Sequence, residues 1–199
     1  MSTRETWNNR YAELDIAYGQ EPNEFLKQEL EKLTPGYLLL PGEGEGRNAI
    51  WAAKQGWRPL AFDYSVEALN KALKWSAREK VRVMYNLTDA ESFRPYWKFD
   101  AIGLIYFHMD RESRKAFHKK LANWLNPGGH VILECFHPEQ LPRTSGGPKI
   151  AELLPDPEDL KQDFEGLTIT HFAITETELN EGPLHQGLAK VIRIVAQKD

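Results

Sequence analysis

Short apolar runs alternate with amphipathic segments along the first 136 residues. Apolar runs of this length predict strands, and apolar residues at helical spacing predict the helices between them. The expected strands cover 37–40, 57–63, 81–85, 99–107 and 131–136, and the expected helices cover 22–33, 48–55, a segment capped by Ser65, and 111–125. A repeated strand–helix–strand unit makes a parallel sheet with helices on both faces, so we expect a doubly wound α/β fold.

The alternation changes after residue 136. Prolines and glycines are frequent over 137–157, which predicts a long loop, and long loops in compact domains are often functional. A short helix over 158–164 and two β-rich runs over 167–177 and 187–196 follow. Because the connection between these runs is short, they predict an antiparallel hairpin at the C-terminal end of a seven-stranded, mostly parallel sheet.

Composition narrows the class of protein. A length of 199 residues fits one domain, and 25 basic against 29 acidic residues give no reason to expect attraction to nucleic acid. One cysteine cannot form an internal disulfide, which favours a reducing compartment. No signal peptide or membrane-length apolar run is visible, so we expect a cytoplasmic protein with neither nucleic-acid nor membrane partners.

Three glycines at every second position connect the first strand to the next helix. Gly42, Gly44 and Gly46 permit positive φ angles and let a ligand approach the backbone at a helix N-terminus. Asp63 ends the second strand, 21 positions after Gly42, where a carboxylate can accept hydrogen bonds from a ribose. Together they indicate an adenosine-containing ligand; the alternatives are a structural turn and a strand-end or helix-capping carboxylate.

The spacing of the glycines differs from the G-x-G-x-x-G of dinucleotide-binding folds, which argues against NAD. With its G-x-G-x-G loop, the chain resembles the class I S-adenosylmethionine-dependent methyltransferases over almost its whole length. It is most similar to small bacterial enzymes of the tellurite-resistance and thiopurine methyltransferase group. The class I resemblance includes Gly42 to Asn48, Asp63, Asn86-Leu87, Phe99-Asp100, Pro127-Gly128-Gly129 and the terminal hairpin. The closer similarity is carried by Tyr18-Gly19, Pro22-Asn23, Gly44 to Ala49 and Gly146 to Lys149.

The resemblance implies a Rossmann-like methyltransferase fold, the cofactor S-adenosylmethionine and its product S-adenosylhomocysteine. It implies that the glycine loop holds the methionine end of the cofactor, that Asp63 holds the ribose, and that Asn86 and Leu87 contact the adenine. The implied cofactor-binding residues are Gly42, Gly44, Glu45, Gly46, Arg47, Asn48, Asp63, Tyr64, Asn86, Leu87, Tyr106 and Phe107. Many family members carry an acid where this chain has Leu40, so Glu45 is a candidate to replace it.

Methyl transfer is an in-line displacement in which the cofactor provides the reactive carbon, and the protein aligns the reactants and excludes water. A base is needed only if the acceptor arrives protonated. His108 and His137 are the candidates, and the alternative for each is a polar strand-end histidine. Tyr11 and Tyr18 either form a lid within an N-terminal segment 1–34 or pack on the core, with 137–157 as the substrate-side loop.

Other polar features favour structural interpretations. The basic residues of the expected 111–125 helix recur opposite its apolar face, which predicts a solvated surface. Cys135 lies in an apolar strand and is expected in the core. The six histidines and one cysteine show no structural zinc pattern, so we expect no metal.

The leading hypothesis is methyl transfer to a small molecule or soft nucleophile by a single domain, 1–199, acting as a monomer or weak homodimer. So compact a chain leaves little room for a macromolecule-recognition domain. The first alternative is a module that binds the cofactor without catalysis. The second is a nicotinamide oxidoreductase, which the glycine spacing disfavours.

Overall fold

Seven strands form one sheet in the order β3-β2-β1-β4-β5-β7-β6. A computed structural model describes residues 4–199, so positions 1–3 of the expected N-terminal segment lie outside the described residues. The parallel strands are β1 (Tyr37–Pro41), β2 (Arg58–Asp63), β3 (Met84–Leu87), β4 (Phe99–Ile105) and β5 (Leu125–Phe136). Strand β7 (Gln186–Gln197) runs antiparallel to β5 and to β6 (Thr168–Asn180), which confirms the predicted sheet and hairpin.

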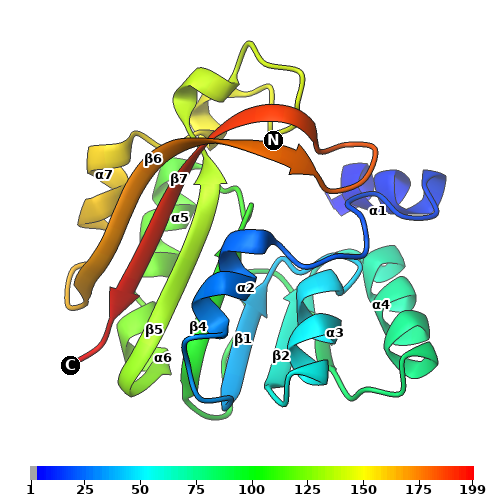
Figure 1. Cartoon of the computed structure of the whole chain (residues 1–199), viewed down its shortest axis with the longest axis horizontal. Coiled ribbons are helices and arrows are strands. Elements are labelled where there is room, and N and C mark those ends of the chain that lie inside the picture. The colour runs from blue at the N-terminus through cyan, green and yellow to red at the C-terminus, as the bar shows by residue number, and fades with distance from the viewer. Residues whose placement is uncertain (1–3) are drawn as a thin grey trace.

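Helices cover both faces of this sheet (Figure 1). One layer contains α2 (Glu24–Leu30), α3 (Arg47–Lys54) and α4 (Val66–Arg78), and the other contains α5 (Arg111–His118), α6 (Leu121–Trp124) and α7 (Pro157–Gln162). A further helix, α1 (Arg4–Glu13), packs against α4, and two short 3-10 helices, η1 (Pro138–Gln140) and η2 (Ala151–Leu153), lie between β5 and α7. None of the described helices is long and apolar enough to cross a bilayer.

Polar side chains define where several helices begin. Ser65 caps α4 by accepting a hydrogen bond from the Ala68 N–H, as the sequence predicts. Asn23 accepts from the Leu26 N–H in the same way, so α2 begins at Glu24 rather than at the expected Pro22. These caps fix the directions in which the connections leave the strands.

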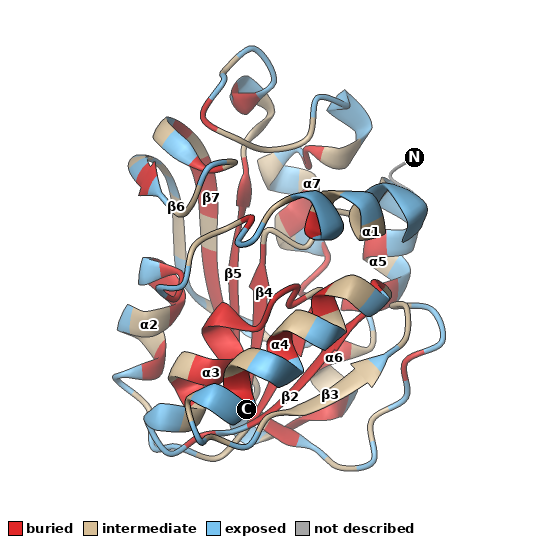
Figure 2. Ribbon diagram, turned by 90° about the vertical axis from the view of Figure 1, so that its right-hand side faces the viewer, coloured by how far each residue is buried: buried red, intermediate tan, exposed pale blue. Residues whose placement is uncertain are grey.

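Two apolar layers hold the helices on the sheet, and the central strands are buried throughout (Figure 2). On the side of α5 to α7, the ring of Phe62 stacks on Phe93 at 4.4 Å and meets Phe117 at 6.3 Å. On the side of α2 and α3, Leu26 and the small Ala49 pack against β1 and β4. The central strands therefore contribute side chains to both layers, which explains their continuous apolar sequences.

Several further element boundaries differ from the prediction. The expected helix 111–125 divides at Lys119 and Lys120, and Leu125 turns to extended backbone because it pairs with Phe99 of β4. A register shift between Phe99 and Ala101 then accommodates the Asn-Pro-Gly-Gly segment inside β5. The third strand begins at Met84 rather than residue 81, because only 84–87 pair with β2.

The predicted solvated face of α5 is wrong for two of its residues. Arg114 and His118 are 5% and 4% exposed, because α7 presents acidic side chains to this face. Asp163 lies 2.6 Å from the Arg114 Nε and 3.1 Å from the His118 Nδ1. Charge pairing with a distant helix therefore buries groups that helical spacing assigned to solvent. Cys135 is 6% exposed, which confirms its core position.

Replacement of Phe62 by alanine tests the aromatic layer. We expect the free energy of unfolding to fall by about 3–5 kcal/mol, because the substitution leaves a cavity beneath β2. Tyr96 is 82% exposed, so Tyr96→Ala should change stability by less than about 0.5 kcal/mol. Urea unfolding followed by circular dichroism measures both; equal losses would contradict this account of the core.

Candidate functional site

The glycine loop connects the end of β1 to α3 at the carboxyl edge of the sheet. Gly42 and Gly44 have φ angles of 61° and 64°, which side-chain-bearing residues rarely adopt. A Cβ atom on Gly42 would lie 2.4 Å from the ring of Phe107, and one on Gly44 would lie 2.5 Å from the hydroxyl oxygen of Tyr11. The loop therefore presents bare backbone to neighbouring groups, as a site for a closely bound cofactor requires.

Asp63 ends β2 beside this loop. One carboxylate oxygen accepts the Gly44 N–H at 3.1 Å and the other accepts the Ser65 N–H at 2.9 Å. Burial raises the pKa of Asp63, and the backbone N–H donors oppose that rise. A carboxylate has about four lone-pair sites, so this group orders two connections and keeps acceptor capacity for a ligand.

Strand pairing brings the expected adenine contacts next to Asp63. In the β2–β3 register, Asn86 pairs with Phe62 and Leu87 pairs with Asp63. Leu87 is 50% exposed, so its apolar side chain is open to a ligand at this edge. Tyr64 follows Asp63 directly and lies on the same connection.

The loop's first glutamate stabilises the start of α3. The Glu43 carboxylate accepts the Ala49 N–H at 2.8 Å and the Asn48 Nδ2–H at 3.1 Å. Burial raises the pKa of Glu43 to about 7, although these donors oppose the rise. Asn48 in turn accepts the Asn23 N–H at 2.8 Å, which ties the loop to the start of α2.

Two residues implied to bind the cofactor face other parts of the chain. Glu45 accepts the Ala17 N–H at 2.8 Å and pairs with Lys71 of α4 at 3.1 Å. Arg47 donates to the Tyr18 carbonyl at 3.1 Å and pairs with Glu181 of the C-terminal hairpin at 3.0 Å. Both side chains thus connect the glycine loop to the segments that cover it.

A second group of side chains lies where β4 and β5 end. Tyr106 has a φ of 50°, and its hydroxyl donates to Glu134 at 2.7 Å. Glu134 is 1% exposed and pairs with Arg193 of β7 at 2.5 Å. The Tyr106 ring stacks on Phe136 at 4.6 Å. A positive φ in a tyrosine costs free energy and is typical of functional sites.

The tip of the C-terminal hairpin completes this group. His185 meets Tyr18 at 4.7 Å and Tyr106 at 4.9 Å in edge-to-face contacts, and its Nδ1 lies 3.1 Å from Glu181. Sequence reasoning missed Glu134, Phe136, Glu181, His185 and Arg193. One signal was available for Glu134, because it interrupts the apolar strand 131–136, whereas nothing in the sequence indicates where the hairpin tip lies.

The two candidate bases occupy different environments. His108 hydrogen-bonds to the Leu153 backbone, and its buried Nε2 has no partner among the described residues. Burial, and then the nearby His185, lowers the pKa of His108 to about 4, so the ring is neutral at pH 7. His137 instead caps the turn 138–140, where its Nδ1 accepts the Glu139 N–H at 3.1 Å. Only His108 lies beside the Tyr106 group.

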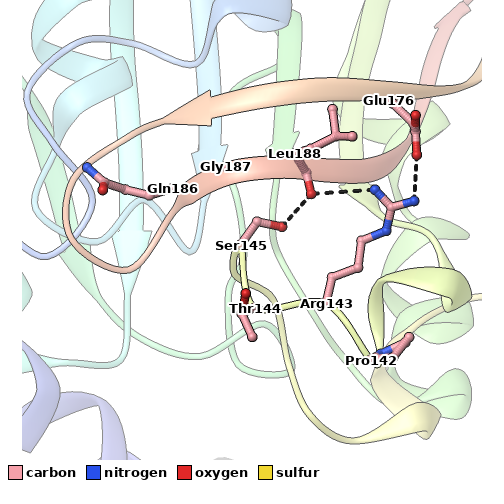
Figure 3. Close-up of a pocket in the computed structure, with 8 residues that line it drawn as sticks. All are labelled: Pro142, Arg143, Thr144, Ser145, Glu176, Gln186, Gly187 and Leu188. Carbon is pink, nitrogen blue, oxygen red and sulfur yellow. Dashed lines mark hydrogen bonds and ion pairs between the residues drawn. The ribbon is translucent and has the colours of Figure 1, made fainter.

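The long loop 137–157 reaches the same region. Its residues 142–145 and the facing residues of the hairpin together line a hollow of about 460 Å³ (Figure 3). The polar groups there pair with each other: Arg143 lies 2.5 Å from Glu176, and Ser145 donates to the Leu188 carbonyl at 2.8 Å. These bonds hold the loop against the hairpin. Gly146 lies so close to the hairpin tip that a Cβ atom at this position would be 2.7 Å from the His185 ring.

In the part of the chain that the structure describes, no three His, Cys, Asp or Glu side chains are grouped as a metal site. The described site therefore consists of a bare backbone loop with Asp63 on one side and an aromatic, imidazole-containing group on the other. The first part suits a ligand held by its backbone contacts and hydroxyls.

Comparison with known proteins gives one family match. Residues 39–129 match a family described as a methyltransferase domain, a range that spans the glycine loop, Asp63 and the Tyr106 segment. No curated protein matches the chain.

Solved structures share the fold at low sequence identity. NodS, an N-methyltransferase from Bradyrhizobium japonicum WM9 in complex with S-adenosylhomocysteine, superposes with a TM-score of 0.74 and 15% identity, over 100% of this chain and 99% of that one. TehB from Haemophilus influenzae gives 0.73 and 16% identity over 87% of this chain, which spans only 61% of TehB. A protein studied for the conversion of a disulfide bond into a thioacetal group during echinomycin biosynthesis gives 0.75 and 16% identity, over 90% and 82% of the two chains.

The raised pKa of Glu43 predicts a pH-dependent stability. Between its ordinary value of 4.5 and about 7, the folded protein holds this proton and the unfolded chain does not. Stability from Glu43 is therefore complete below pH 4.5 and is lost as the pH rises through 7. Relative to Glu43→Gln, wild type should lose up to about 3 kcal/mol of unfolding free energy between pH 4.5 and 8.

Urea unfolding at several pH values measures this difference. The exchange Glu112→Gln, at a side chain that is 87% exposed, serves as the control. If the stability curves of wild type and Glu43→Gln run parallel over this range, the proposed proton linkage is wrong.

Proposed function

We propose that this chain, which belongs to the class I S-adenosylmethionine-dependent methyltransferases, transfers the methyl group of that cofactor to a small molecule. When bound, S-adenosylmethionine supplies an activated methyl carbon on a sulfonium. The protein's residues hold the cofactor, orient the acceptor and exclude water. The observation that carries the small-molecule assignment is that Tyr18, Gly146 and His185 cover the carboxyl ends of β4 and β5.

The residues beside β1 and β2 fit the cofactor. Gly42 and Gly44 have no Cβ, so Phe107 and Tyr11 approach their backbone closely, and this loop adjoins the N-terminus of α3. Asp63 would accept the ribose hydroxyls with its remaining lone pairs, and Asn86 and Leu87 would contact the adenine beside it. Leu40 provides no carboxylate for the amino group, so backbone carbonyls of the loop would serve there.

The acceptor side is covered and has its charges paired. Tyr18 from the N-terminal segment and Gly146 from the long loop both contact His185 at the hairpin tip. Glu134 is neutralised by Arg193, and Glu181 by Arg47. A covered group of aromatic rings without an unpaired charge favours a small neutral acceptor over a macromolecule or a strongly charged compound.

His108 is the base that we propose for an acceptor that arrives protonated. Its ring is neutral at pH 7, and the bond to Leu153 occupies Nδ1, so the Nε2 lone pair is available. An unpaired buried acceptor costs about 1–3 kcal/mol, which a hydrogen bond from the acceptor's nucleophile would remove. Alignment supplies most of the rate acceleration, so an acceptor that is already deprotonated would need no base.

Cofactor binding tests the first part of the proposal. Calorimetric titration should show that S-adenosylhomocysteine binds wild type and that Asp63→Asn binds it roughly 10- to 100-fold more weakly, because a charged acceptor is lost. Asp100→Asn is the matched control, since its carboxylate also accepts a backbone N–H, from Tyr37 at 2.7 Å, at the opposite edge of the sheet. Failure of wild type to bind, or equal binding by Asp63→Asn, would contradict the assigned site.

The fate of the methyl group tests the second part. Wild type is incubated with methyl-labelled S-adenosylmethionine and cell extract, and the extract is then separated by ultrafiltration. We expect enzyme-dependent label in the small-molecule fraction, because the cover excludes large acceptors. Label in protein or nucleic acid would contradict the acceptor class, and cofactor binding without any transfer would favour the non-catalytic module.

A further inference from the structure

The N-terminal helix depends on contacts outside itself. Helix α1 has ten residues, and Tyr11 is its only buried one. Helices of this length are marginal in water, and the asparagines and aromatic residues of α1 are weak helix formers. Its position is therefore set by the surfaces that it touches at the carboxyl edge of the sheet.

Tyr11 places this helix on the glycine loop. Its ring packs between Trp7 at 5.6 Å and Tyr18 at 6.3 Å, and its hydroxyl lies against Gly44. Burial raises the pKa of Tyr11, and the nearby Asp63 carboxylate raises it further. The Tyr11 hydroxyl thus faces the loop next to Asp63, where the proposed function puts the cofactor.

Lys71 and Glu45 hold the chain immediately after α1, and we call this ion pair with its backbone contacts the clasp. Lys71 of α4 donates to the carbonyls of Leu14 and Asp15 and pairs with Glu45 at 3.1 Å. The other Glu45 oxygen accepts the Ala17 N–H at 2.8 Å. Glu45 is 8% exposed, so this contact excludes water better than a surface ion pair does. The clasp therefore joins the segment 14–17 to the same loop that Tyr11 covers.

We propose that α1 is part of the cofactor site: the Tyr11 hydroxyl contacts the bound cofactor, and Glu45 and Lys71 are positioning residues that hold α1 over it. This inference rests on the proposed function. It assigns Glu45 a role different from direct binding, because both of its carboxylate oxygens already have partners in the chain. Loss of the clasp would free α1 and speed cofactor release.

A second ion pair, between α3 and the end of α4, provides a matched control for the clasp. Lys54 of α3 and Glu79 at the end of α4 form an ion pair of 2.8 Å on the surface, away from the segment 14–17. Lys54→Met and Glu79→Gln remove the same chemical groups as Lys71→Met and Glu45→Gln. They test whether any loss of affinity is specific to the clasp.

S-adenosylhomocysteine is the probe for the test. Its dissociation constant is measured by calorimetry and its release rate by stopped-flow tryptophan fluorescence. We expect Tyr11→Phe, Glu45→Gln and Lys71→Met each to weaken binding about tenfold, chiefly through faster release. The double variant Glu45→Gln/Lys71→Met should bind no more weakly than the weaker single variant, because both changes open one clasp. Lys71→Arg should restore part of the affinity.

Proteolysis gives a readout that a general loss of stability would not produce. Arg10 lies in α1, so tryptic cleavage after Arg10 reports whether this helix is closed. The probe should protect wild type and the Lys54→Met and Glu79→Gln controls. It should not protect Lys71→Met or Glu45→Gln, even at concentrations that saturate them.

The outcomes separate this inference from the proposed function. If wild type does not bind the probe, the proposed function fails. If wild type binds and the Tyr11 and clasp variants bind equally well, only the inference is overturned. If Glu45→Gln weakens binding and Lys71→Met does not, Glu45 contacts the cofactor directly and the clasp is wrong.

Discussion

The carboxylate of Asp63 joins the two connections from which the candidate site is built. It accepts the N–H of Gly44 from the first connection and the N–H of Ser65 from the second. Without this acceptor, two buried N–H groups would lack partners, and the glycine loop would keep only its backbone bond from Glu43 to the Phe62 carbonyl of β2. Glu43, the cap of α4 and the position of Tyr11 all depend on the loop geometry that this one group sets.

The buried charges of the site act in pairs across long sequence distances. Glu134 of β5 meets Arg193 of β7, and Arg47 of α3 meets Glu181 at the hairpin tip. A buried charge is costly unless it is paired and hydrogen-bonded, so these pairs fix how the C-terminal hairpin lies over the parallel strands. The same pairing leaves these buried carboxylates without an unpaired charge.

Much of the fold was predictable because its signals are local. Strands buried on both faces have continuous apolar sequences, and helices between them have apolar residues at helical spacing, so the parallel sheet followed from the pattern. The glycine loop and Asp63 were also recognisable, since their spacing reflects the geometry of one strand–helix–strand unit. Boundaries were less accurate at α5 and β5, because the pairing of Leu125 with Phe99 overrides helical spacing.

The sequence by itself therefore determined the sheet, the helices that cover it and the loop suited to a cofactor. Only the tertiary structure decided what covers that loop. Tyr11, Glu181 and His185 are far from it in sequence and carry no periodic signal, and their positions follow from how α1 and the hairpin pack. The same holds for Glu45, whose carboxylate is directed by Lys71 and Ala17, because side-chain partners are chosen by the fold and not by neighbours in the chain.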